Sequence, residues 1–216
     1  MTSAASLEVQ AINDVRRSFI IFAGNHRALK QILVTLTETP AGIVMLAQSQ
    51  LNDAIQELSR RLHNFVAAAV SLIEHTENLH NDLYNRNRVF QDYWLERRRE
   101  FDEDPLAQFV EKLRNYCAHF AVAVPIYQIR MERGTEGSQP STDMFTLLKV
   151  SDLRRYPKWN AKARAFMDGK ETIDLVEVID QYTDKVKSFY DWYWQRQQEV
   201  GLASNNGLKS SENKQS

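Results

Sequence analysis

The stretch from Asp104 to Phe120, DPLAQFVEKLRNYCAHF, carries the strongest helix signal in the chain together with several reactive polar side chains. Asp104 predicts a helix N-cap, because its carboxylate accepts hydrogen bonds from the free amides of the first turn. Pro105 suits the first helical position, where no amide hydrogen is needed. The apolar residues that follow recur at helical spacing and predict one buried stripe: Leu106, Phe109, Val110, Leu113, Tyr116, Cys117 and Phe120.

Three polar residues of the same stretch, Arg114, Asn115 and His119, lie off this stripe. Asn115 and His119 are four residues apart and fall within contact, whereas Arg114 and His119 are five apart and diverge by about 140° on a straight helix. One regular helix therefore does not join the arginine to the histidine. A distorted helix, or a two-fold partner that presents the same face, would bring them together.

The segment Arg114-Asn115-Tyr116-Cys117-Ala118-His119 resembles the R-x4-6-H signature of HEPN domains, which are all-helical and include many metal-independent ribonucleases. Asn115 matches the polar residue that the family usually carries after the arginine. The resemblance implies a homodimer with RNA as its substrate and with no cofactor or metal. By analogy it implies a toxin or phage-defence effector with a cognate antitoxin or regulator. The match is confined to this helix, and the chain is longer than a minimal HEPN domain.

The resemblance also implies roles for the three polar residues. His119 would be the general acid and base, since histidine has an ordinary pKa of about 6.5. Arg114 would hold the phosphate, because its guanidinium grips phosphate oxygens and stays charged. Asn115 would orient the imidazole or bond the backbone, and cleavage would leave a 2′,3′-cyclic phosphate and a 5′-hydroxyl. The alternative is that Glu111 merely pairs with Arg114, and that the chain is a non-catalytic helical module that binds a protein or nucleotide through a dimer.

Composition sets the class. The 216 residues include only 7 Gly and 5 Pro, which predicts a mainly all-α fold with long antiparallel helices. We expect one HEPN-like domain over residues 1–200, with a β-hairpin insertion over 125–150 and a disordered tail over 201–216. A formal charge of −1 gives no global attraction to nucleic acid, so any RNA contact is expected to be local.

The lone Cys117 excludes an intramolecular disulfide and any multi-cysteine metal site. The start MTSAASLEVQ lacks a basic region followed by an apolar run, which predicts cytoplasmic residence. The longest apolar run, within residues 64–73, is shorter than the roughly 18 residues of a membrane span. We therefore expect no membrane partner.

Apolar spacing predicts the remaining helices. The first covers residues 6–22 and ends at Gly24-Asn25, and a second covers 29–36. The longest runs over about 43–84, with breaks left open at Ser49-Gln50 and at His75-Thr76. A short basic helix within 158–167 ends at Gly169, and a long one over 171–199 ends at Gly201.

A hairpin is expected directly after the motif. Residues 126–131 alternate after Pro125, and 144–150 form a second β-compatible run. The polar loop over 132–143 is a substrate guide or has no function.

Three further clusters have alternative interpretations. The run Arg97-Arg98-Arg99 suggests RNA, but its acidic neighbours favour internal pairing. The aromatic residues 189–194 are able to stack on bases, but their helical spacing favours a core. His75 and His80 are five apart, a poor spacing for a shared metal, and His26 and His63 are interpreted as structural.

Overall fold

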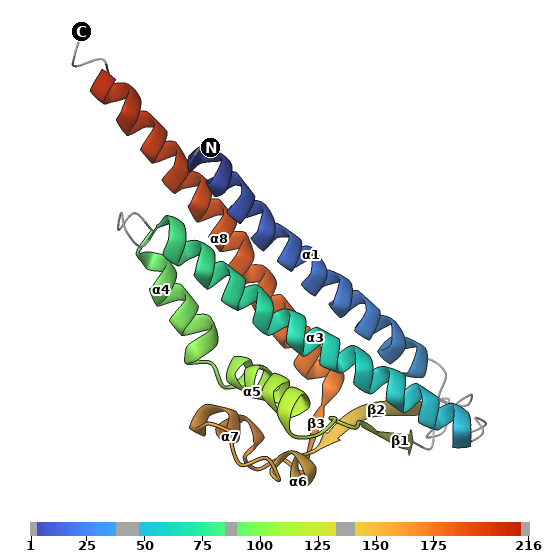
Figure 1. Cartoon of the computed structure of the whole chain (residues 1–216). Helices are drawn as coiled ribbons and strands as arrows, with labels where there is room; N and C mark the ends of the chain where they lie inside the picture. Colours follow the sequence, from blue (N-terminus) through green and yellow to red (C-terminus); the bar gives the residue numbers. More distant parts are fainter. Residues whose placement is uncertain (1–3, 38–47, 85–89, 133–140, 213–216) are drawn as a thin grey trace.

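The computed structural model of the chain describes the backbone of residues 4–37, 48–84, 90–132 and 141–212, and most side chains in these ranges. Three long helices make up most of it: α1 (Ala4–Thr37), α3 (Gln48–Leu83) and α8 (Leu175–Glu212) (Figure 1). The shorter elements are α4 (Asp92–Arg97), the π-helix η1 (Arg98–Asp102), α5 (Pro105–His119), β1 (Ile126–Glu132), β2 (Ser141–Lys149), α6 (Val150–Leu153), α7 (Ala161–Met167) and β3 (Thr172–Asp174). The predicted mainly all-α class is confirmed.

Helix α1 runs antiparallel to both α3 and α8 (Figure 1). On α1, Val15, Phe22 and Leu29 recur every seven residues, and each is at most 1% exposed. This spacing keeps one face of the helix directed at its neighbours along its length. The same buried cluster continues through α3, α5 and α8, so the long helices and the shorter elements share one core.

The predicted stop at Gly24-Asn25 was wrong, because α1 continues through both residues. The buried stripe has the same register before and after Gly24, so packing of Phe22 and Leu29 outweighs the cost of about 1 kcal/mol that glycine imposes on a helix interior. The Asn25 side chain donates to the carbonyl of Ile21 (2.9 Å) without interrupting the helix.

Replacing Gly24 with alanine is expected to stabilise the protein by about 0.5–1 kcal/mol, because a helical Cβ at this exposed site would meet no atom within 4 Å. The midpoint of urea unfolding, followed by far-UV circular dichroism, should rise. The matched control is Gly169→Ala, which should lower the midpoint, since Gly169 has a φ of 73°. A lower midpoint for Gly24→Ala would contradict the continuous packing of α1.

Helix α3 is unbroken at both positions that the sequence left open. Thr76 remains within it, because its hydroxyl bonds the carbonyl of Leu72 (2.8 Å) and contacts the hydroxyl of Tyr190 on α8. Residues 43–47, where the predicted helix began, lie outside the described part of the chain.

Helix α8 differs from the prediction at both ends. It begins at Leu175, where the carboxylate of Asp174 accepts from the amides of Val176 (2.8 Å) and Glu177 (3.2 Å). The predicted end at Gly201 was wrong, because the helix continues to Glu212. The disorder expected for the tail stays a prediction. One glycine costs too little to stop a helix that long.

The predicted hairpin is present. Strand β1 pairs antiparallel with β2, with Ile126 opposite Leu147 and Ile129 opposite Met144. Strand β3 was not predicted; it adds to the other side of β2, with Ile173 opposite Leu148. The loop residues 133–140 lie outside the described ranges, so the role of the loop stays a prediction.

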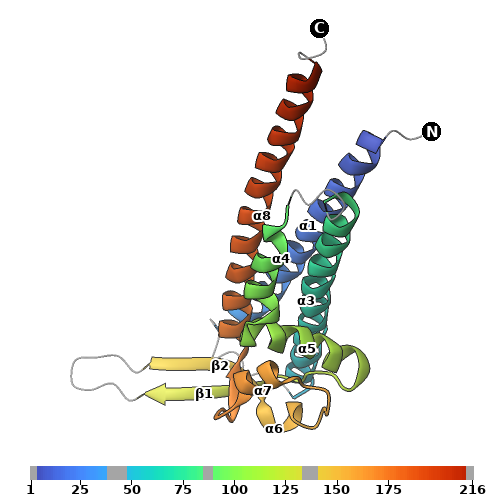
Figure 2. The ribbon, with the colours of Figure 1, turned by 90° about the vertical axis from the view of Figure 1, so that its left-hand side faces the viewer.

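Helices α5, α6 and α7 lie together at one end of the long helices, next to the sheet (Figure 2). Aromatic rings join them: Trp159 stacks on Phe109 at 5.5 Å between centroids and 8° between planes, and Phe166 lies 4.8 Å from the same ring. The indole of Trp159 also donates to the carbonyl of Leu153 (2.7 Å). This packing fixes α5, which carries the motif, to the short helices beneath it.

Candidate functional site

The start of α5 has the predicted cap. The Asp104 carboxylate accepts from the amide of Ala107 at 2.7 Å, and Pro105 opens the helix. The second oxygen of Asp104 lies 3.3 Å from the ammonium group of Lys185 on α8. The helix therefore has a fixed first turn that is also tied to the long helices.

The predicted apolar stripe of α5 is buried over most of its length. Leu106, Phe109, Val110, Leu113 and Tyr116 are at most 8% exposed, whereas Phe120, just after the helix, is 44% exposed. Cys117 is half-buried, and burial raises the pKa of its thiol to about 11. A thiol that stays protonated at neutral pH is a poor nucleophile.

Arg114 and Asn115 are half-buried and touch each other. The Arg114 guanidinium donates to the side-chain oxygen of Asn115 at 3.0 Å. Both residues line a cavity of about 260 Å³ among α3, η1, α5 and α8. The same cavity is lined by one further guanidinium, that of Arg97, and by four carboxylates: Glu74, Glu77, Asp102 and Glu111. The arginine of the motif therefore faces an acidic surrounding within one chain.

The other charges of this cavity are largely paired. Arg97 binds Glu77 (2.9 Å) and Asp102 (2.7 Å), and Glu111 binds Lys112 (2.7 Å) and accepts from Gln108 (3.1 Å). Arg114 and Glu111 line the same cavity, but each has another partner. The alternative prediction, that Glu111 pairs with Arg114, is therefore not met in this chain.

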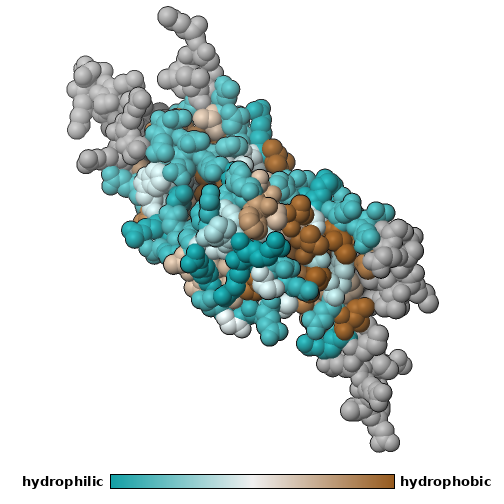
Figure 3. Space-filling model, turned by 60° about the horizontal axis from the view of Figure 1, so that its bottom comes forward, coloured by the Kyte–Doolittle hydropathy of each residue, from teal (hydrophilic) through white to brown (hydrophobic). Residues whose placement is uncertain are grey.

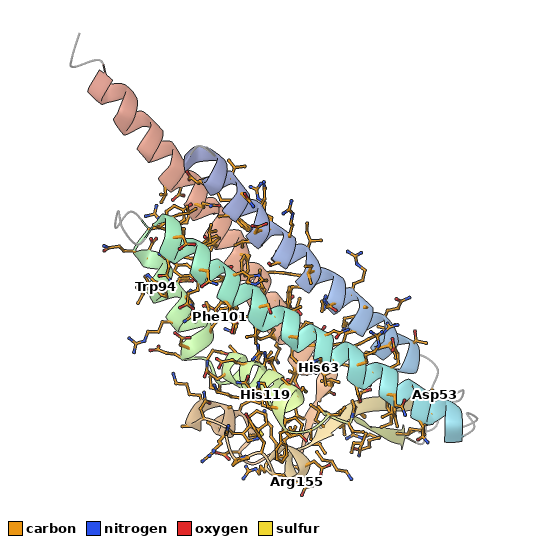
Figure 4. The ribbon with its side chains drawn as sticks, viewed as in Figure 1. Asp53, His63, Trp94, Phe101, His119 and Arg155 are labelled. Atoms are coloured by element: carbon orange, nitrogen blue, oxygen red, sulfur yellow. The ribbon has the colours of Figure 1, made fainter. Side chains whose placement is uncertain are left out.

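His119 ends α5 and lies elsewhere. Its side chain is exposed, it is not among the residues that line the cavity, and in the described part of the chain it makes no hydrogen bond or ion pair. Figure 4 shows it at the end of α5 that faces α6. A regular α-helix connects Arg114 to His119, so the divergence expected from helix geometry holds within one chain.

A larger cavity of about 510 Å³ lies between α3 and the C-terminal end of α5. Residues of α3, including the exposed Arg60 and His63, form one wall, and Cys117 with the segment 122–124 forms the other. The sequence pointed to none of the α3 residues, since nothing in their local pattern shows which helix they face. His63, interpreted as structural, is in fact exposed.

The arginine run, the aromatic residues 189–194 and the pair His75 and His80 all have structural partners or are buried. Each arginine of the run 97–99 is paired with a nearby carboxylate, which confirms the predicted internal pairing. Phe189, Tyr190 and Tyr193 are at most 2% exposed and belong to the core. His75 bonds Ser18 (2.7 Å), whereas His80 is buried, so the two do not share a site.

The described residues also bear on a metal site and on a membrane-spanning helix. Within the ranges that the structure describes, no group of three or more His, Cys, Asp or Glu residues is placed to hold a metal ion. None of the described helices has an apolar stretch of the length that a membrane crossing needs.

The stability of the fold should depend on His80. Its ring is 1% exposed and stacks on Tyr93 at 4.0 Å, and burial lowers its pKa to about 4, with the nearby charge of Asp92 opposing that fall. The unfolded chain binds this proton near pH 6.5, whereas the folded chain does not until about pH 4. The free energy of unfolding should thus decrease by about 2–3 kcal/mol as pH falls through this window.

Urea titrations at several pH values test this, with His80→Phe as the comparison. The variant removes the titrating group and should show a shallower dependence between pH 6.5 and pH 4.5, where most carboxylates remain ionised. Parallel curves for the two proteins would refute the assignment of this pH dependence to His80.

Comparison of the chain with known protein families, with curated proteins and with solved structures finds no match.

Proposed function

We propose that the protein is a metal-independent endoribonuclease of the HEPN type that acts as a homodimer. The observation that carries this proposal is the state of His119: an exposed imidazole without a partner in the described part of the chain, at the end of a capped helix. One turn earlier, Arg114 and Asn115 are held together by a hydrogen bond. The helix supplies a proton-transfer group and a phosphate-binding group on a rigid support.

A second copy of the chain is part of the proposal, because Arg114 and His119 diverge within one chain. Exposed apolar residues follow His119 directly: Phe120 is 44%, Val122 63% and Val124 54% exposed. In Figure 3, hydrophobic surface gathers on one side of this end of the molecule. Exposed apolar side chains of this kind favour burial against a partner, and a two-fold axis beside them would place two motif helices together.

In such a dimer the chemistry needs no metal. In each site the His119 imidazole of one protomer would accept the proton of the 2′-hydroxyl beside Arg114 of its partner, and a water molecule would supply the proton that the leaving 5′-oxygen takes. Arg114 would stabilise the charge on the phosphate oxygens in the transition state. Asn115, which already accepts a hydrogen bond from Arg114, would hold the guanidinium in place.

A second candidate function is a non-catalytic helical module that dimerises and binds a protein or a nucleotide. The observation that favours it is the acidic cavity around Arg114, because four carboxylates repel a phosphodiester. In that case Arg114 and Asn115 only brace the packing of α3 against α5. The role of toxin or defence effector, and a cognate antitoxin, stay predictions of the family resemblance alone.

Incubation of the protein with a mixed pool of single-stranded and structured RNA in EDTA separates the two candidates. The ribonuclease should cut the pool and leave 2′,3′-cyclic phosphate and 5′-hydroxyl ends, as identified by end-group mapping. Absence of cleavage would favour the helical module, whereas cleavage that requires a metal would contradict the metal-independent mechanism.

A further inference from the structure

The segment 149–170, which contains α6 and α7, is strongly basic. It carries seven Lys and Arg residues against two Asp, a net charge of +5, whereas the remaining residues sum to −6. The overall charge of −1 therefore conceals a local excess of positive charge. Such an excess on one surface of an otherwise acidic protein attracts a polyanion to that surface in particular.

Several of these charges already have partners. Arg154 binds Asp168 at 2.9 Å, the Lys162 ammonium donates to the carbonyl of Asp102 (2.8 Å), and Lys170 lies 3.7 Å from the centroid of the Phe166 ring. Lys149, Arg155 and Lys158 are different: their side chains are exposed and form no ion pair within the described ranges. These three cations are free to bind phosphate.

The segment holds its charges on a rigid support. Asn160 caps α7 by accepting from the amide of Ala163 (2.8 Å), and its amide group donates to Gln108 of α5. Trp159, next to Lys158, stacks on Phe109. The backbone that carries these cations is thus already ordered, so RNA binding incurs no cost for ordering this part of the chain.

Ring contacts place the segment beside the end of α5. Tyr156 lies 5.4 Å from the ring of Phe120 and 5.9 Å from that of Tyr116. Arg155 precedes Tyr156 in the chain, and Tyr156 packs on Phe120, the residue after His119. Burial raises the pKa of Tyr116, and the charge of Arg155 is near enough to oppose that rise. Figure 4 shows both labelled residues, His119 and Arg155, in this part of the molecule.

A hollow of about 350 Å³ between α6 and α7 extends this surface. Its lining includes the guanidinium groups of Arg154 and Arg164, the carboxylate of Asp168 that binds Arg154, and the buried rings of Tyr156 and Trp159. A guanidinium group binds phosphate, so Arg164, which forms no ion pair within the described ranges, adds to the cations of this surface. Its volume falls within the range of small-molecule clefts, about 300–1,000 Å³.

We propose that the exposed cations of residues 149–170, above all Arg155 and Lys158, bind the phosphate backbone of single-stranded RNA and lead it to His119. This inference rests on the proposed ribonuclease function, since it names the surface that would hold the substrate. The carboxylates around Arg114 repel a phosphodiester, so the cavity itself contributes little affinity for RNA. In the proposed arrangement that affinity comes from α6 and α7, outside the cavity.

Binding of a fluorescently labelled single-stranded RNA, measured by anisotropy in EDTA, tests the proposal. All proteins carry His119→Ala, so that cleavage does not disturb the measurement. Adding Arg155→Ala and Lys158→Ala together should weaken binding about tenfold or more at about 50 mM salt. The slope of log K against log salt should fall by about 1.4, since each phosphate contact on a single strand contributes about 0.7.

The matched control is Arg17→Ala with Arg27→Ala, which removes the same charge from exposed positions on α1. It should leave the affinity within about twofold, because these side chains lie outside the basic segment. Equal losses in the two double variants, or no loss in the first, would overturn the proposal, as would a clear preference for anionic vesicles over RNA. Binding that depends on Arg155 and Lys158 without cleavage by the wild type would support the surface and refute only the ribonuclease.

Discussion

His119→Ala is expected to lower the rate of RNA cleavage by about 1,000-fold, within the range of 10²–10⁴ that general acid–base catalysis contributes. The side chain is exposed, so its removal opens no cavity, and the thermal unfolding curve should not change. The measurement is the initial rate of cleavage of a single labelled RNA in EDTA. Because the variant keeps its fold, the loss would report the missing imidazole.

The control is His75→Ala. His75 is also exposed, it lies on α3, and it bonds Ser18 rather than any residue of the motif. Its rate should stay within about twofold of the wild type. A similar loss in both variants would point to misfolding, and an unchanged rate in His119→Ala would remove the histidine from the mechanism or reveal a contaminating nuclease.

Mixing two inactive variants tests whether the site forms between chains. Arg114→Ala and His119→Ala homodimers should each be inactive. In a mixed dimer, one site would combine the intact Arg114 of one protomer with the intact His119 of its partner, so about a quarter of the wild-type rate should return after subunit exchange. No recovery would place both residues in a site within one chain, against the divergence that α5 imposes on them.

The sequence was most informative where local signals agree. Asp104, Pro105 and the spacing from Leu106 to Tyr116 are sufficient to define α5, because a cap and a stripe depend only on residues within the helix. The separation of Arg114 from His119 also follows from helix geometry alone. For the same reason the hairpin could be predicted, since its two strands alternate on either side of a polar loop.

The features that were missed depend on distant contacts. Gly24 looked like a stop, but the packing of Phe22 and Leu29 carries α1 through it. Strand β3 is three residues long and exists only because β2 lies beside it. The carboxylates around Arg114 come from α3 and η1 as well as α5, so no local pattern predicted that the motif arginine faces acidic neighbours.

Phe109→Ala is the stability change with the largest expected effect, about 3–5 kcal/mol. Phe109 is fully buried on α5, and its ring contacts Trp159 and Phe166 of the α7 region. The substitution removes the centre of this aromatic contact and leaves a cavity that the stacked rings fill poorly. The free energy of unfolding, from urea titration followed by far-UV circular dichroism, should fall by this amount.

Phe120→Ala is the matched control, because the ring is of the same type and lies just beyond the same helix, but is 44% exposed. We expect it to cost about 1 kcal/mol, since it loses only its contacts with Tyr116 and Tyr156. In Phe109→Ala the basic segment should also lose its fixed position under α5, so RNA affinity should fall together with stability. A Phe109→Ala protein as stable as Phe120→Ala would mean that α7 is not anchored through this ring, and the basic surface would then lack the rigid support on which its proposed role depends.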